Sequence, residues 1–207
     1  MKAISAAKDF DQIEMSIDRA IDRSKMLPDR VFRSTLKYFL FITFDELYMT
    51  LFFNHVKRYL DKVGERAFWL VTIDPDPRSY FFHHFGFYGA FEFLSSDNED
   101  DYVSALNDYP KDNHADSLMS NSNSLVAVSS SGEWAIFSSR DDDIAICGFS
   151  DRAQMEIFRS VYGSDLLNDV NAAAEYAYAT SGDAQRIERF HKNYSSDWAL
   201  PTTPSTT

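Results

Sequence analysis

Two neighbouring histidines, His83 and His84, are the residues of this sequence best suited to acid–base chemistry. They lie in the segment FFHHFGFYGAFEFL, residues 81–94. Histidine titrates near neutral pH, so either ring could act as a general base with Glu92 or Asp74 as its carboxylate partner. Aromatic walls around such a base would suit a planar or sugar ligand. One hypothesis is therefore an enzyme with an aromatic-lined pocket.

A metal site at the same histidines is disfavoured by the strand pattern that the segment predicts. Residues 79–85 and 87–94 are interpreted as two paired strands, or one bent strand, rich in aromatic side chains. Successive side chains of a strand point to opposite faces, so His83 would face the phenylalanines and His84 would lie with Glu92 on the more polar face. The two rings could not share one ion. The pattern thus favours aromatic sheet, and no metal is predicted.

Nucleophilic chemistry finds little support elsewhere in the chain. The single cysteine, Cys147, lies in the apolar run IAICGF, where a buried and inert thiol is expected. One cysteine also excludes a disulfide framework. No G-x-S-x-G motif and no phosphate-binding glycine loop are present. We therefore expect a protein that is not an enzyme and has neither catalytic residues nor a cofactor.

The charge of the chain is unevenly distributed. The net charge is −12, yet residues 1–64 hold eleven Lys/Arg against nine Asp/Glu, and residues 65–207 hold nine against twenty-three. An acidic surface repels phosphate backbones and attracts basic proteins. The sequence thus predicts a basic protein partner and no direct contact with nucleic acid.

Two acidic clusters are the predicted partner-binding sites. One lies at the start of a predicted helix within residues 97–116, and the other is the turn RDDD at residues 140–143. Exposed tyrosines nearby would act as anchors, with the acids providing steering and register. Neither cluster has the spacing of a calcium loop. The predicted contact residues are Asp97, Glu99, Asp100, Asp101, Tyr102, Tyr109, Asp141, Asp142 and Asp143.

The pattern of apolar residues predicts an α+β fold with a mostly antiparallel sheet and flanking N-terminal and C-terminal helices. In the first half, helices are expected over 9–25 and 44–63, the second with a Thr43/Glu46 capping box and Gly64 as its C-cap, and a strand over 66–74. In the second half, a short acidic helix precedes a three-stranded meander, and three more helices follow. These last helices are expected over 152–162, from 165 to about 180, and from about 183 to 193.

A single globular domain over residues 1–196 is expected, followed by a disordered polar tail over 197–207. The first residues lack the apolar core of a signal peptide, and early apolar runs are too short to span a membrane. A reducing, cytoplasmic location without membrane attachment is the resulting prediction. The oligomeric state is left open.

The meander SLVAVSSSGEWAIFSSRDDDIAICGF, residues 124–149, resembles the closing sheet of several bacterial immunity proteins of polymorphic and contact-dependent toxin systems. The resemblance rests on Gly132, Trp134, Asp141 to Asp143 and Ile144 to Ile146. It implies a cytoplasmic antidote that binds a cognate toxin and occludes its active site through an acidic surface. A third hypothesis, an acidic mimic of DNA, agrees less well with acids that are clustered rather than evenly spaced.

Overall fold

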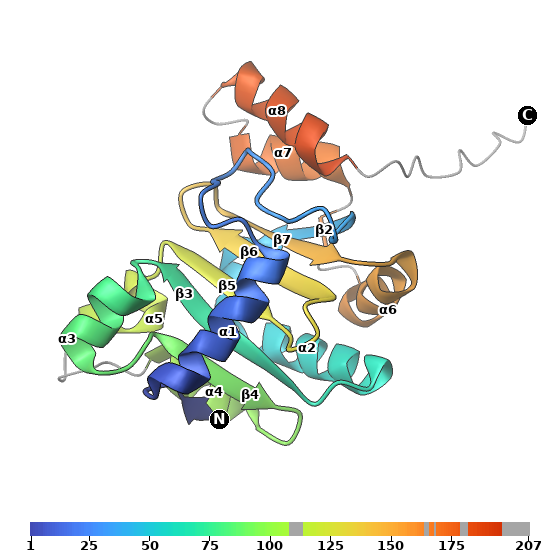
Figure 1. The fold of residues 1–207 in the computed structure, drawn as a ribbon. Coiled ribbons are helices and arrows are strands. Elements are labelled where there is room, and N and C mark those ends of the chain that lie inside the picture. The colour runs from blue at the N-terminus through green and yellow to red at the C-terminus, as the bar shows by residue number, and fades with distance from the viewer. Residues whose placement is uncertain (108–113, 164–165, 168, 179–181, 196–207) are drawn as a thin grey trace, which may run out of the picture.

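The computed structural model describes residues 1–107, 114–163, 166–167, 169–178 and 182–195. They form a seven-stranded antiparallel sheet between two layers of helices (Figure 1). The strand order is β1-β4-β3-β5-β6-β7-β2. This architecture confirms the predicted α+β class. The predicted tail, residues 197–207, lies outside the described residues.

The sheet is built from strands that pair in antiparallel fashion throughout. Its central part is the consecutive meander β5-β6-β7, which the sequence predicted. The short strand β1 and the strand β2 form the two edges. The strands are β1 (Lys2–Ala3), β2 (Tyr38–Thr43), β3 (Ala67–Asp74), β4 (Ala90–Leu94), β5 (Ser124–Val128), β6 (Trp134–Ser139) and β7 (Ile144–Phe149).

Helices cover both faces of the sheet. The α-helices are α1 (Ala7–Ala20), α2 (Thr50–Val63), α3 (His83–Phe85), α4 (Glu99–Asn107), α5 (Leu118–Asn121), α6 (Arg152–Tyr162), α7 (Val170–Tyr178) and α8 (Ala184–Tyr194). Helical turns of other types are the 3₁₀ turns η1 (Phe44–Tyr48) and η4 (His114–Asp116) and the π-helical turn η2 (Pro77–Phe82). The predicted helices at the two ends of the chain are thus present, with shifted boundaries.

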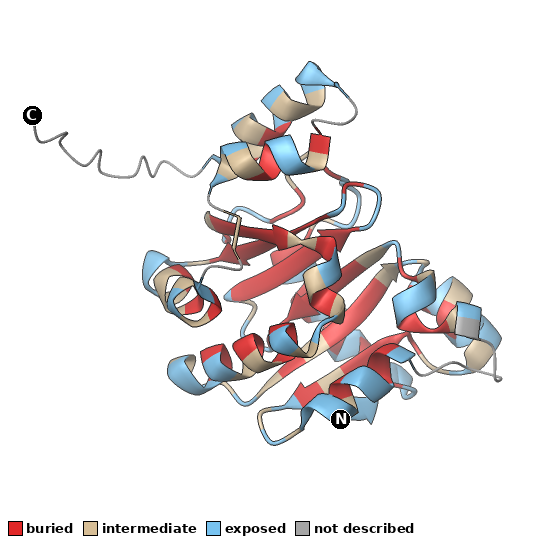
Figure 2. Ribbon diagram, turned by 180° about the vertical axis from the view of Figure 1, so that it is seen from behind, coloured by how far each residue is buried: buried red, intermediate tan, exposed pale blue. Residues whose placement is uncertain are grey.

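Two hydrophobic cores result from this layering, one on each face. Alternate residues of β5 show the division, because Leu125 belongs to the core under α2, α4, α5 and α6, whereas Val126 belongs to the core under α1, α7 and α8. All residues of β6 and β7 are buried, as Figure 2 shows for the central strands. Uninterrupted apolar runs such as IAICGF are explained by this burial on both faces.

The predicted helix over 44–63 is correct only at its end. Gly64 has φ +76° and caps α2 in the left-handed conformation, as expected. The capping box is wrong, since Thr43 makes no side-chain cap and residues 44–48 form the 3₁₀ turn η1 before α2 begins at Thr50.

The predicted strand over 79–85 is also wrong. Residues 77–85 form the helical turns η2 and α3, and only Ala90–Leu94 is strand. Asp76 accepts hydrogen bonds from the N–H groups of Arg78 and Ser79, and Pro77 follows at the first helical position. Gly86, with φ +77°, ends the segment. The helix-capping residues at the two ends of the segment therefore determine its structure, although its aromatic residues alternate as in a strand.

Candidate protein-binding surface

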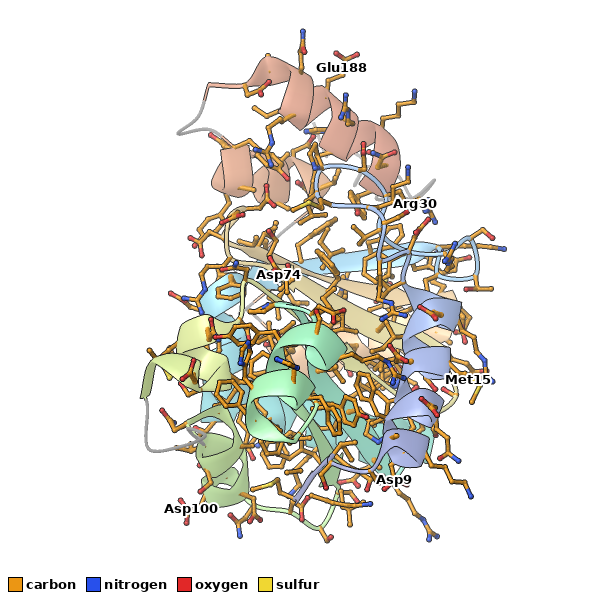
Figure 3. All side chains as sticks on the ribbon, turned by 60° about the vertical axis from the view of Figure 1, so that its left-hand side comes forward. Asp9, Met15, Arg30, Asp74, Asp100 and Glu188 are labelled. Carbon is orange, nitrogen blue, oxygen red and sulfur yellow. The ribbon has the colours of Figure 1, made fainter. Side chains whose placement is uncertain are left out.

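The two acidic clusters lie at opposite ends of the sheet. Residues 97–101 follow the end of β4, which pairs with the start of β3. The turn 140–143 connects the end of β6 to the start of β7, at the end of the sheet where Asp74 closes β3. Figure 3 shows Asp74 and Asp100 well apart. One compact partner site cannot contain both clusters, so each is judged by its own contacts.

The cluster at 97–101 stabilises the start of α4. Asp97 accepts a hydrogen bond of 2.8 Å from the backbone N–H of Leu94. Partial burial raises the pKa of Asp97, but hydrogen bonds from the amino group of Met1 and from Leu94 lower it below its usual value overall. Asn98 and Asp101 cap each other's backbone N–H groups at 3.0 Å. These acids have a structural use that needs no partner.

The two tyrosines predicted as anchors of this cluster are not available for that role in the structure. Tyr102 is wrong as an exposed anchor, because its side chain is 0 % exposed and its ring stacks on Phe53 at 5.0 Å. Its hydroxyl donates to the carbonyl of Leu47. Tyr109 lies outside the described residues. Of the cluster's acids, Glu99 and Asp100 are exposed, and Glu99 accepts a 2.6 Å hydrogen bond from Asn54.

In the turn, the three aspartates differ in their surroundings. Asp142 is 5 % exposed, pairs with Arg186 of α8 and accepts a 2.6 Å hydrogen bond from the Ser139 hydroxyl. It is therefore wrong as a partner contact, since its carboxylate points inward. Asp141 and Asp143 are exposed, as predicted for contact residues.

Asp143 joins two distant segments to the turn. Its backbone is left-handed, with φ +53°, and its carbonyl accepts a 3.2 Å hydrogen bond from the N–H of Phe44. Its carboxylate accepts a 3.0 Å hydrogen bond from the hydroxyl of Tyr176 on α7. Tyr176 is 44 % exposed. The fold thus places an oriented, accessible tyrosine beside the acidic turn.

Asp45 adds a third exposed carboxylate at this place. Some burial, and then the carboxylates of Asp143 and Asp45, raise the pKa of Tyr176 above its usual value. The negative potential at the tyrosine hydroxyl therefore comes from two segments of the chain.

Arg140, which is also exposed, connects several segments of the same region. Its guanidinium lies 5.0 Å from the ring centroid of Phe44 and donates to the hydroxyl of Tyr48 at 3.0 Å and to the carbonyl of Met119 at 2.7 Å. The side chain of Met119 is 41 % exposed. We call the exposed group made of Asp45, Asp141, Asp143, Tyr176 and Met119 the turn surface.

Tyr176, Asp45 and Met119 were missed by reasoning from sequence. Tyr176 is 33 residues from Asp143 along the chain, and its helix reaches the turn only because α7 packs on β2 and β7. The sequence of α7 has two tyrosines among its alanines, Tyr176 and Tyr178, and it did not indicate that Tyr176 would be the exposed one.

The hypothetical catalytic histidines do not form a catalytic arrangement in the described residues. His83 and His84 are exposed on α3, and their rings contact each other and, for His84, Tyr80 and Phe85. No hydrogen bond or ion pair between either ring and Glu92 or Asp74 occurs within the described part of the chain. Burial raises the pKa of Cys147 well above its usual value, so its thiol stays protonated.

Two other kinds of feature, a cluster of metal ligands and a membrane-spanning helix, are not found in the part of the chain that the structure describes. Its His, Cys, Asp and Glu side chains form no group of three or more that could hold a metal ion. None of its helices has the length and apolar character needed to cross a membrane.

Comparisons of the chain with protein families, with curated proteins and with solved structures find no match.

Proposed function

We propose that this protein is an immunity-type inhibitor, which binds a basic cognate protein toxin and blocks its active site through the turn surface. The observation that carries the proposal is the exposed Tyr176, held at 3.0 Å by Asp143 in a turn that also presents Asp141. Tyrosine is enriched among the residues that dominate binding energy at interfaces. Here its orientation is fixed before a partner arrives, which lowers the entropy lost on binding.

Charge supports the same proposal. Asp45, Asp141 and Asp143 are exposed acids of the turn surface, and together they outweigh the single positive charge of the neighbouring Arg140, which is also exposed and donates only to neutral groups of Tyr48, Ser122 and Met119. Such a surface attracts a basic patch and accelerates its association. The resemblance of the meander to immunity proteins involves this same turn. A toxin acting on nucleic acid would have a basic active site suited to it.

The alternative hypotheses gain no comparable observation. The enzyme hypothesis required a histidine with a carboxylate partner, and the described residues contain no such pair at His83 or His84. The DNA-mimic hypothesis required acids along one continuous face, and the two clusters lie at opposite ends of the sheet. An interface at a single turn fits a compact protein partner better.

The first test is to identify the partner and its effect. If the gene adjacent to this one encodes a large secreted protein with a variable C-terminal toxin domain, that domain should copurify with this chain. Expression of the domain alone should arrest growth, and coexpression with this chain should restore it. Copurification without rescue of growth would contradict inhibition.

A charge-reversal variant tests the surface itself. We expect Asp45→Lys combined with Asp141→Lys to slow association with the toxin domain about tenfold at low salt, because steering depends on the sign of the local charge. Both side chains are exposed, so the fold should be retained. Association rates measured by surface plasmon resonance at two salt concentrations provide the readout, and the difference should shrink at high salt.

The matched control is Asp61→Lys combined with Asp100→Lys. It changes the net charge equally, but both residues are exposed away from the turn surface, on α2 and α4. We expect its association rate to change less than threefold, since distant charges are screened. An equal loss for both variants would show that only net charge matters and would contradict an interface at the turn.

A further inference from the structure

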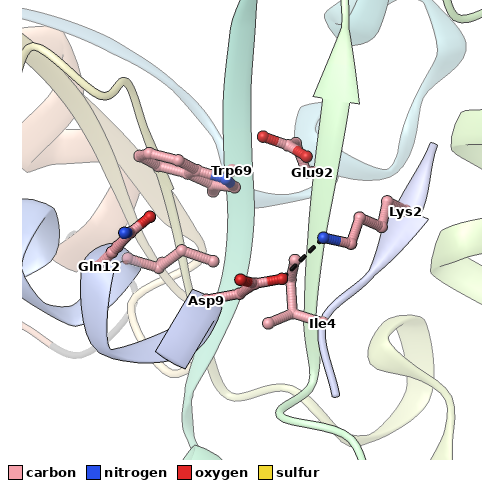
Figure 4. A pocket seen from close by; sticks show the side chains of 7 residues that line it. Lys2, Ile4, Asp9, Gln12, Trp69 and Glu92 are labelled. Carbon is pink, nitrogen blue, oxygen red and sulfur yellow. Dashed lines mark hydrogen bonds and ion pairs between the residues drawn. The ribbon is translucent and has the colours of Figure 1, made fainter. Parts of the chain in front are cut away.

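A small hollow lies between α1 and the β1 edge of the sheet, separate from the turn surface. Its volume is about 180 Å³, and it opens to solvent. Figure 4 shows that side chains from the first strand, the first helix and the strands β3 and β4 converge on it. The residues that line it are Lys2, Ile4, Asp9, Gln12, Ile13, Trp69 and Glu92.

The sheet creates the hollow through a row of residues in register. Lys2 of β1 pairs with Glu92 of β4, and Glu92 pairs with Trp69 of β3. Residues opposite each other on neighbouring strands place their side chains on the same face. Helix α1 covers this face of the sheet with its buried side chains Phe10 and Ile13. The neighbouring row of Lys2, Glu92 and Trp69 is left partly open to solvent. Trp69 is accordingly only partly buried.

The charges in the hollow are not balanced. The Lys2 ammonium lies 2.7 Å from Asp9, and this pair is exposed, with side-chain exposures of 60 % and 42 %. The hydrogen bond that the Lys2 ammonium donates to Asp9, together with the negative charge of Asp9, raises the pKa of Lys2, with a smaller contribution from Glu92. The carboxylate of Glu92 forms no hydrogen bond or ion pair with the described residues. One negative charge thus remains uncompensated beside the indole ring.

We propose that this hollow binds one guanidinium or primary ammonium group, which lies against the ring of Trp69 and pairs with the carboxylate of Glu92. Tryptophan is the aromatic side chain that attracts cations most strongly. An exposed ion pair such as Lys2 and Asp9 contributes little free energy. A cation that enters the hollow can therefore displace the Lys2 ammonium from its place beside the two carboxylates.

The size of the hollow limits the ligand to a small group. The hollow has a volume of about 180 Å³. Pockets for drug-sized molecules start at about 300 Å³. The ligand is therefore the end of an arginine or lysine side chain, or a free amine or guanidine of similar size. The site does not depend on the toxin-binding proposal, because it lies at the other edge of the sheet from β2 and β7.

Methylguanidine and its neutral analogue methylurea provide the first test. The indole N–H signal of Trp69 should shift saturably in ¹H–¹⁵N spectra as methylguanidine is added, and methylurea should leave it unchanged. Assignment of this signal comes from the Trp69→Phe variant. Equal shifts with both compounds, or no shift with either, would overturn the proposal.

Two substitutions test the assigned roles. We expect Glu92→Gln to weaken methylguanidine binding about fivefold or more, since the pairing charge is lost, and Lys2→Ala to strengthen it, because the competing ammonium is removed. Asp100→Asn, an equal charge change at an exposed site, should leave the affinity unchanged. The spectra also show whether each variant is folded. Unchanged affinity in folded Glu92→Gln would contradict the proposed pairing.

A peptide arm distinguishes the sources of the cation. The probe is acetyl-Gly-Arg-Gly-amide, compared with the same peptide containing citrulline. Saturable binding of the arginine peptide alone would support a site for a side chain of a partner. Binding of methylguanidine without either peptide would support a site for a free small cation. Binding of both peptides with equal affinity would overturn recognition by charge.

Discussion

The Gly89→Ala variant is expected to lose about 2–5 kcal/mol of its free energy of unfolding, from a backbone penalty and an overpacking penalty. Gly89 lies between α3 and β4 with φ +57°, a conformation that costs a residue with a Cβ about 1–2 kcal/mol. An alanine Cβ would lie 2.6 Å from Cγ2 of Thr72 and 2.8 Å from Cγ of Phe81. Both neighbours are 0 % exposed, so neither can move into solvent, and overpacking adds about 1–3 kcal/mol.

Gly86→Ala is the matched control. Gly86 has φ +77°, but the space where its Cβ would lie is open within 4 Å. Only the backbone penalty applies, so we expect a loss of about 1–2 kcal/mol. Urea unfolding followed by circular dichroism measures both variants. Equal losses would show that the contact with Thr72 and Phe81 contributes nothing, contrary to the packing described for this segment.

The helical turns that end at Gly86 explain why the segment 81–94 misled the sequence interpretation. Its aromatic residues alternate well enough to predict strands, yet they also recur at a spacing of four. Tyr80 contacts His84 at 5.2 Å between ring centroids, and Phe81 contacts Phe85 at 6.0 Å, which is the i, i+4 pairing of a helix. Asp76 and Gly86 bounded that helix in the sequence. Local capping residues were therefore better evidence than the periodicity of a short aromatic run.

The meander and the terminal helices were predictable because local signals agree with burial there. β5, β6 and β7 are apolar runs separated by turn residues, and Asp151 and Asp183 cap α6 and α8 through their side chains. Nothing local indicated that β2 would pair with β7 across the sheet edge. That pairing joins residues about a hundred positions apart, and it also brings α7 to the turn. The fold class thus follows from local patterns, whereas the arrangement of the turn surface depends on long-range pairing.

For the candidate site, the sequence predicted the negative charge of the turn but not which of its carboxylates would face solvent. The run RDDD indicates an acidic turn, yet identical neighbouring residues carry no information on which carboxylate faces solvent. The conformation of the turn decides this, because Asp142 points toward α8 while Asp141 and Asp143 are exposed. Acids that the sequence offered as free contacts are similarly engaged within the fold, since Asp97 accepts a hydrogen bond from the N–H of Leu94 and Asp101 accepts one from the N–H of Asn98 at the start of α4.

Asp142→Ala is expected to lower the free energy of unfolding by about 2–3 kcal/mol. Removing one partner of a fully buried ion pair costs about 3–5 kcal/mol, and the exposure of Arg186, 39 %, allows water to offset part of that loss. The Ser139 hydroxyl also loses its 2.6 Å acceptor in a buried position. Thermal and urea unfolding give the measurement, and hydrogen exchange should show the largest change in α8.

Asp141→Ala, the neighbouring exposed acid, is the control and should change stability by less than about 0.5 kcal/mol. The proposed toxin interface predicts a different pattern for binding of a toxin domain. Loss of Asp142 should act on stability first, because its carboxylate joins α8 to the turn, whereas loss of Asp141 should act on association alone. If Asp141→Ala destabilised the fold as much as Asp142→Ala, the division of this turn into one structural acid and two available acids would be wrong.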